Sequence, residues 1–283
     1  MTVVPPPRIS FVAVIVGTIA ALVFRAWLQL ELLGDGFQKD YAADLSYLVV
    51  PPTLFVLLFP IWRQYLSFIV SLFRRDVLTP TLILNAFAVG CLLRVAAWSQ
   101  LIAGVAFGWY YNPDPTAMVG PAFAFSCAAP HVIALGVVVM VIMVPFVEEL
   151  VSRGLVQSWL SHRGAIISIG LSALFFMLWH RPSSWGFAFF GGLVLGVQYW
   201  RTGALWSPLI SHATVNALIQ WDWRCLNVLW NPRSSDLPEL GAAIPALVAL
   251  IAADIAFIFL LGKTPGRPAA PAERVTEREQ PAQ

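Results

Sequence analysis

Long apolar runs separated by short polar segments dominate this chain. A run of about 17 to 25 apolar residues is long enough to cross a lipid bilayer as a helix. By this criterion the sequence predicts eight spans, at residues 9–30, 45–62, 78–98, 131–160, 165–180, 185–200, 205–221 and 241–261. The segment 64–73 is too short to cross and is expected at the interface or as a re-entrant piece. The predicted fold is therefore all-α, a polytopic membrane helix bundle of about eight transmembrane helices.

The basic residues predict the orientation of these spans. With eight spans, one side of the membrane collects Arg8, Arg63, Arg74, Arg75, Arg163, Arg201 and the tail that begins at Lys263. The loops on the opposite side carry a mixture of acidic and basic residues. Short cytoplasmic loops are enriched in arginine and lysine, so both termini are expected to be cytoplasmic.

The same pattern divides the chain into four parts. Residues 1–130 are expected to hold about three N-terminal spans and their loops, the first of them an uncleaved span and not a signal peptide. Residues 131–221 form a membrane core, and residues 222–262 an outer loop and the last span. The Pro-, Ala- and charge-rich segment 263–283 is expected to be a disordered cytoplasmic tail.

Composition supports the membrane assignment and excludes several other classes. Hydrophobic residues make up 59% and charged residues 11% of the 283 residues, whereas soluble domains average about half and about a quarter. The three cysteines, Cys91, Cys127 and Cys225, have no spacing typical of a disulfide framework or a zinc knuckle. No nucleotide-binding fingerprint is present, and no nucleic-acid partner is expected.

A few ionisable residues interrupt the apolar runs, and such residues are functional candidates by default. In the stretch VEELVSR, Glu149 and Arg153 are four residues apart, the favourable order for an ion pair on a helix. Glu148 lies about 100° further round and cannot share that arginine equally well. Glu148 is therefore the unpaired carboxylate, although a solvated helix end at the lipid surface would also explain two adjacent glutamates.

Two further polar groups follow in the next spans. His180 ends the run LFFMLWH, with Phe176 one turn earlier on the same face. In SPLISHATVNAL, His212 and Asn216 are four residues apart and point the same way. An interfacial histidine and simple hydrogen bonding between helices remain alternatives. The three segments nevertheless reach similar intermediate depths, and short loops join them, so we expect the side chains to converge.

This combination of groups fits hydrolysis. A buried carboxylate without its own cation, such as Glu148, can polarise a water and accept its proton when an imidazole lies beside it. His212 and Asn216 are donors that could stabilise the oxyanion of a tetrahedral intermediate. Glu148, His180 and His212 also match the ligand set of a catalytic zinc with one open position, although there is no HExxH motif.

Three motifs follow one another along the chain: EExxxR at 148–153, FxxxH at 176–180 and HxxxN at 212–216. Together and in this order they resemble the motifs of the CPBP family. This family comprises the CAAX proteases and bacteriocin-processing enzymes, also called Abi proteins. The resemblance covers residues 145–218 and implies a glutamate-dependent intramembrane endopeptidase. Glu148 and His180 would activate the water, His212 and Asn216 would bind the oxyanion, and Glu149, Arg153 and Phe176 would support the site.

The resemblance implies that no cofactor is required, with zinc as the less favoured alternative. The Arg-poor chain without organelle signals suggests a multi-pass protein of a bacterial inner (plasma) membrane, and the expected substrate is a membrane-associated protein or peptide. A proton-coupled transporter and an inert membrane scaffold are the rival classes. Arg94 and Asp254, which are predicted to form a structural ion pair between the third and eighth spans, favour the transporter to some extent.

Overall fold

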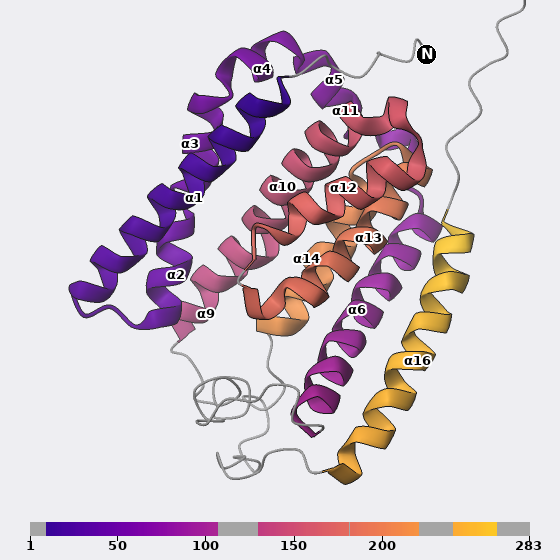
Figure 1. Cartoon of the computed structure of the whole chain (residues 1–283). Helices are drawn as coiled ribbons and strands as arrows, with labels where there is room; N and C mark the ends of the chain where they lie inside the picture. The colour runs from indigo at the N-terminus through magenta and orange to yellow at the C-terminus, as the bar shows by residue number, and fades with distance from the viewer. Residues whose placement is uncertain (1–9, 107–129, 181, 221–239, 265–283) are drawn as a thin grey trace, which may run out of the picture.

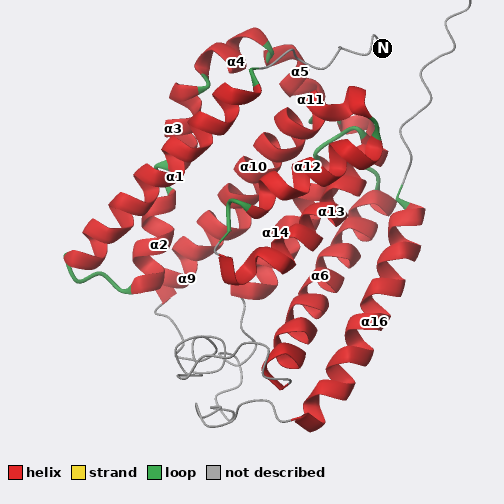
Figure 2. Ribbon diagram, viewed as in Figure 1, coloured by secondary structure: helices red, strands yellow, loops and turns green. Residues whose placement is uncertain are grey.

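The computed structural model describes residues 10–106, 130–180, 182–220 and 240–264, all of them helical or in short connections. The α-helices are α1 (Phe11–Gly34), α2 (Lys39–Tyr47), α3 (Val50–Leu57), α4 (Phe59–Gln64), α5 (Leu66–Ser71), α6 (Pro80–Ala106), α9 (Pro130–Gly136), α10 (Val144–Glu149), α11 (Ser158–Leu160), α12 (Ala165–Met177), α13 (Trp185–Thr202), α14 (Trp206–Gln220) and α16 (Leu240–Lys263). Short 3₁₀ turns lie at Arg75–Val77, Ser161–Arg163 and Pro182–Ser184, and π-helical segments at η2 (Val137–Met143) and η3 (Leu150–Gln157). Figure 2 shows helices in every described part of the chain, which confirms the all-α prediction.

Four of the helical stretches are long and apolar enough to cross a membrane within the described residues, namely Phe11–Gly34, Pro80–Ala97, His131–Arg163 and Ile244–Lys263. Each coincides with a predicted span. The predicted span 45–62 is instead broken into α2, α3 and α4. Prolines near the starts of α3 and α4 lack the N–H that a continuous helix would need. The total of eight spans remains a prediction.

The helices form a bundle around one continuous central helix (Figure 1). Residues 130–160 run through α9, η2, α10, η3 and α11 without a break in helical backbone. In Figure 1, α1, α2 and α3 lie on one side of it, α12, α13 and α14 on the other, and α6 and α16 pair at the far side. The central helix therefore contacts both the N-terminal helices and the helices that follow it.

The start of α1, the helices α4, α5 and α11, and the end of α16 lie at the same end of the bundle (Figure 1). These are the elements next to the basic residues that were predicted to be cytoplasmic. Contacts at this end include Arg74 Nη2 with the Thr202 carbonyl at 2.9 Å and Leu205 N–H with the Leu72 carbonyl at 2.8 Å. The arrangement agrees with the predicted grouping of basic residues, while the side of the membrane remains a prediction.

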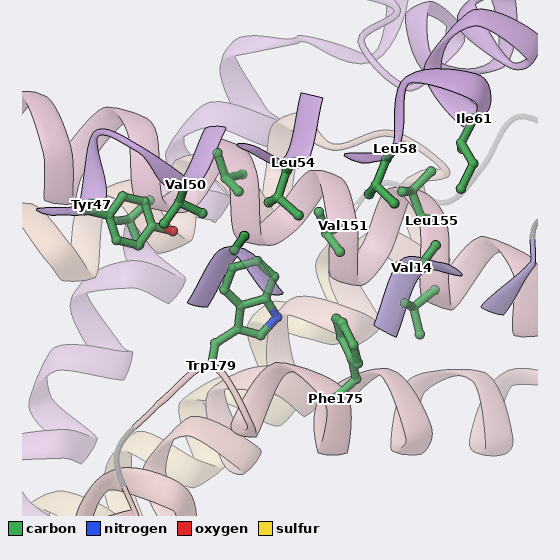
Figure 3. Packing of buried hydrophobic residues seen from close by; sticks show 14 of the residues in the cluster. Val14, Tyr47, Val50, Leu54, Leu58, Ile61, Val151, Leu155, Phe175 and Trp179 are labelled. Atoms are coloured by element: carbon green, nitrogen blue, oxygen red, sulfur yellow. The ribbon is translucent and has the colours of Figure 1, made fainter. Parts of the chain in front are cut away.

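A cluster of buried side chains joins the N-terminal helices to the central helix and to the α12 region. In Figure 3, Val50, Leu54 and Leu58 pack along the central helix, opposite Val151 and Leu155. Phe175 and Trp179 of the α12 region close the same cluster from below. In a membrane these side chains gain close van der Waals packing and not escape from water, and this packing fixes the N-terminal helices against the central one.

Close approach of α6 and α14 depends on Gly90. A Cβ atom at this position would lie 2.5 Å from Cβ of Thr214 and 2.6 Å from the Ser211 carbonyl oxygen. Only glycine fits such a separation, and α14 carries His212 between these two contacts.

The predicted pair of Arg94 and Asp254 lies on α6 and α16, which pack together, and the ion pair itself remains a prediction. The outer loop at 222–239 and the tail beyond Thr264 lie outside the described residues.

Candidate active site

Glu149 and Arg153 form the ion pair that their spacing predicts. Arg153 Nη1 donates to Oε1 of Glu149 at 3.1 Å, and both side chains are fully buried. Arg153 Nη2 donates to the Gly192 carbonyl of α13 at 3.0 Å. The Arg153 guanidinium also lies over the Phe176 ring, with Cζ 4.3 Å from the centroid. The arginine therefore ties the central helix to both α12 and α13.

Glu149 has a second partner that the sequence did not predict. Its Oε1 also lies 2.9 Å from Nδ1 of His212, a residue 63 positions later in the chain. An ionised carboxylate only accepts hydrogen bonds, so Nδ1 of His212 is the donor in this contact. The pairing fixes the orientation of the His212 ring and turns Nε2 toward Glu148.

Glu148 is buried, with 4% of its surface exposed. Its Oε2 lies 4.0 Å from Nε2 of His212 and has no hydrogen-bond partner. The carboxylate is thus left out of the Arg153 pair, as the helical spacing predicts. A buried acceptor without a partner is an unusual and costly arrangement in a native protein, and it calls for an explanation.

His180 and Phe176 extend the cluster on the α12 side. Nδ1 of His180 contacts the Phe176 carbonyl at 3.1 Å, and because a carbonyl cannot donate, Nδ1 carries the hydrogen. In the neutral ring Nε2 is then free to accept. The Phe176 ring stands between the two imidazoles, with centroid separations of 4.9 Å to His180 and 5.5 Å to His212. Within the described residues, the ion-pair contact of Glu148 is with His212, and none joins it to His180.

Asn216 is held by the backbone of the central helix. Its Nδ2 donates to the Met140 carbonyl at 2.7 Å. The backbone here follows a π-helical register, in which Val144 N–H bonds to the Val139 carbonyl five residues earlier. The next donor in that register would be Pro145, which has no N–H. The Asn216 amide supplies the missing donor, so the proline and the π-helical turn together create its docking point.

Two residues that the sequence did not single out approach Glu148 from the N-terminal helices. The hydroxyl of Tyr47, at the end of α2, faces the Glu148 carboxylate. The Arg25 guanidinium of α1 lies over the Tyr47 ring, with Cζ 4.7 Å from the centroid. Arg25 lies inside the first apolar run, and that placement is the sequence signal that could have identified it.

The predicted alternative with zinc requires a three-ligand set. Within the part of the chain that the structure describes, no group of three or more His, Cys, Asp or Glu side chains is arranged to hold a metal ion. Nδ1 of each histidine is occupied, by Glu149 and by the Phe176 carbonyl. These contacts leave Nε2 of both histidines as the nitrogen that a metal would bind, and a reaction without a metal stays a prediction.

Comparison with known protein families finds a match over the segment that carries the three motifs. Residues 130–218 match the family model described as type II CAAX prenyl endopeptidase Rce1-like. This segment contains EExxxR, FxxxH and HxxxN, and the match confirms the resemblance of the three motifs to the CAAX proteases. No curated protein and no solved structure gives a match. Tyr47 and Arg25 lie outside the matched segment.

Proposed function

We propose that this chain is an intramembrane endopeptidase that hydrolyses a peptide bond in a membrane-associated protein or peptide with a water activated by Glu148. The family match at residues 130–218 supports the class of reaction. The observation that carries the proposal is the separation of the two adjacent glutamates. Oε1 of Glu149 is held by both Arg153 and His212, whereas Glu148 approaches His212 only at 4.0 Å; Oε2 of each glutamate has no hydrogen-bond partner.

In the proposed reaction, Glu148 accepts a proton from the attacking water, and the hydroxide adds to the peptide carbonyl carbon. Nε2 of His180, left as an acceptor by the bond of Nδ1 to the Phe176 carbonyl, holds and orients the same water. The carbonyl oxygen becomes an oxyanion. The proton held by Glu148 then passes to the peptide nitrogen, the C–N bond breaks, and a carboxylate and an amine leave.

His212 and Asn216 of α14 would stabilise the oxyanion. With Nδ1 of His212 on Glu149, a doubly protonated ring has Nε2–H available for the oxyanion. Asn216 has a second amide hydrogen besides the one on Met140. Donors that are fixed before the reaction are worth more than mobile ones, because they need no reorganisation as the charge forms. Glu149 and Met140 fix these two.

The expected setting is the plasma membrane of a prokaryotic cell. Four apolar helices among the described residues support a membrane location. We propose that the substrate is a peptide or protein segment at the membrane, not a prenylated C-terminus.

The test compares membrane proteomes from cells that produce the wild-type protein, Glu148→Gln or a control, Glu31→Gln. Glu31 is an exposed residue on α1. New N- and C-termini should appear with the wild type and the control and be absent with Glu148→Gln. Unchanged termini in all cells, or full cleavage by Glu148→Gln, would contradict the proposal. A proton-dependent flux into liposomes that His180→Ala abolishes would instead favour a transporter.

A further inference from the structure

Tyr47 is a buried residue whose polar atom has no partner. It is the last residue of α2, 2% of its surface is exposed, and its hydroxyl accepts or donates no hydrogen bond. Buried tyrosines usually find a partner for their hydroxyl, and phenylalanine would fill the same space without a polar group. Packing alone therefore does not explain a tyrosine at this position.

The ring of Tyr47 is firmly held. Figure 3 shows it beside Val50, in the cluster that also contains Val151 and Trp179. The Arg25 guanidinium covers the ring at 4.7 Å, and such a contact is attractive because the ring face is electron-rich. Contacts of this kind fix the direction of the hydroxyl as well as the position of the ring.

That direction is toward Glu148. The hydroxyl faces the Glu148 carboxylate at the limit of hydrogen-bond range, without the geometry of a fully formed bond. Oε2 of Glu148 is likewise a buried acceptor without a partner, and His212 Nε2 lies 4.0 Å from it. Two unsatisfied buried groups, one that can donate and one that can accept, thus face each other across the candidate active site.

We propose that Tyr47 is a positioning residue for Glu148, and that its hydroxyl donates to the carboxylate when substrate and water fill the site. Hydrogen bonds in a catalytic site are often long before substrate binds and tighten in the complex. The bond would fix the rotation of the carboxylate, so that one oxygen faces the water while the other is held. This inference rests on the proposed function. It extends the working site to the N-terminal helices, outside the segment that matches the family model.

The main test is Tyr47→Phe, measured in proteoliposomes with a quenched peptide that spans a cleavage site found by terminus mapping. The variant should lower the thermal midpoint only slightly, because in the resting state the hydroxyl lies against the Glu148 carboxylate without a hydrogen bond of normal geometry. Misplacement of the general base should lower kcat by about 10- to 100-fold, with little change in KM. A variant with wild-type kcat would overturn the proposal while leaving the endopeptidase function intact.

Tyr199→Phe is the matched control. Tyr199 is also buried, but its hydroxyl contacts Ser158 Oγ at 2.5 Å. Removing a hydroxyl that has a partner should lower the thermal midpoint and leave kcat unchanged. The two variants are therefore expected to show opposite patterns, and an equal fall of kcat in both would contradict a specific role for Tyr47.

A second measurement does not depend on cleavage. Thermal midpoints in detergent are compared for the wild type, Tyr47→Phe, Glu148→Gln and the double variant. If the hydroxyl and the carboxylate interact, Tyr47→Phe will shift the midpoint differently in the two backgrounds. Equal shifts would overturn the proposal, even if the wild type cleaves no peptide. Absent cleavage with unequal shifts would refute the endopeptidase function and keep the contact.

Discussion

Oε1 of Glu149 accepts from His212 Nδ1 at 2.9 Å, and the same oxygen accepts from Arg153 at 3.1 Å. One carboxylate oxygen therefore connects the central helix to α14, which carries the HxxxN motif. The arrangement neutralises the buried arginine and orients the imidazole at the same time. Glu149 thus has a structural and an orienting function, and it cannot exchange places with its neighbour Glu148.

Replacing Glu149 by glutamine should destabilise the protein far more than the same change at Glu148. Loss of Glu149 leaves the fully buried Arg153 without its carboxylate. Removing one partner of a buried ion pair costs about 3–5 kcal/mol. Denaturation in mixed detergent micelles and the folded yield measure the difference. Equal losses in the two variants would contradict the division of functions between the glutamates.

Asn216→Ala should remove both an oxyanion donor and the partner of the Met140 carbonyl. Loss of one such donor lowers kcat by about 10²- to 10³-fold, and an unsatisfied buried carbonyl costs about 1–3 kcal/mol. Adding Pro145→Ala restores a backbone N–H to the π-helical turn. The double variant should recover part of the stability and none of the activity. Recovery of activity would show that Asn216 acts only through Met140.

Gly192→Ala should disturb the Arg153 contact from the side of α13. A Cβ atom there would lie 3.0 Å from Cα and Cβ of Ala173, backbone-anchored atoms that cannot move aside. We expect a loss of about 1–3 kcal/mol from overpacking and reduced activity, because the Gly192 carbonyl accepts from Arg153. Gly191→Ala is the control, since its Cβ would meet nothing within 4 Å. Thermal midpoints that fall equally in both variants would contradict this account.

Gly90→Ala should displace α14 and with it His212. The added Cβ would come within 2.5 Å of Thr214 and 2.6 Å of the Ser211 carbonyl. Separating the helices should lower kcat by at least about tenfold, because small displacements of catalytic groups are costly. Gly170→Ala, with open space around the new Cβ, should behave as the wild type in the same cleavage assay.

Metal content distinguishes the two hydrolytic mechanisms. We expect purified enzyme that is active in the cleavage assay to contain far less than one zinc per chain, and a strong chelator to leave its rate unchanged. Atomic emission on dialysed protein, beside Glu148→Gln as a control, gives the stoichiometry. One zinc per active chain, lost together with activity on chelation, would support the metalloprotease mechanism instead.

The sequence predicts the helices and the split of the two glutamates, because both depend on local geometry. Apolar runs indicate helices, and the four-residue spacing of Glu149 and Arg153 predicts their ion pair, which the structure contains. The sequence did not predict that the span 45–62 would break into three helices. Proline at the start of a helix and proline within a helix look alike in an apolar run, and packing decides between them.

Only the tertiary structure determines which groups from distant segments meet. The contact of His212 with Glu149 bridges 63 residues, and that of Asn216 with Met140 bridges 76. Tyr47 reaches Glu148 because α2 packs against the start of the central helix. Spacing along one helix fixes angles and rises, so a sequence determines neighbours on the same helix. Partners on other helices depend on close approach, as at Gly90 and Gly192, which is a property of the packed bundle.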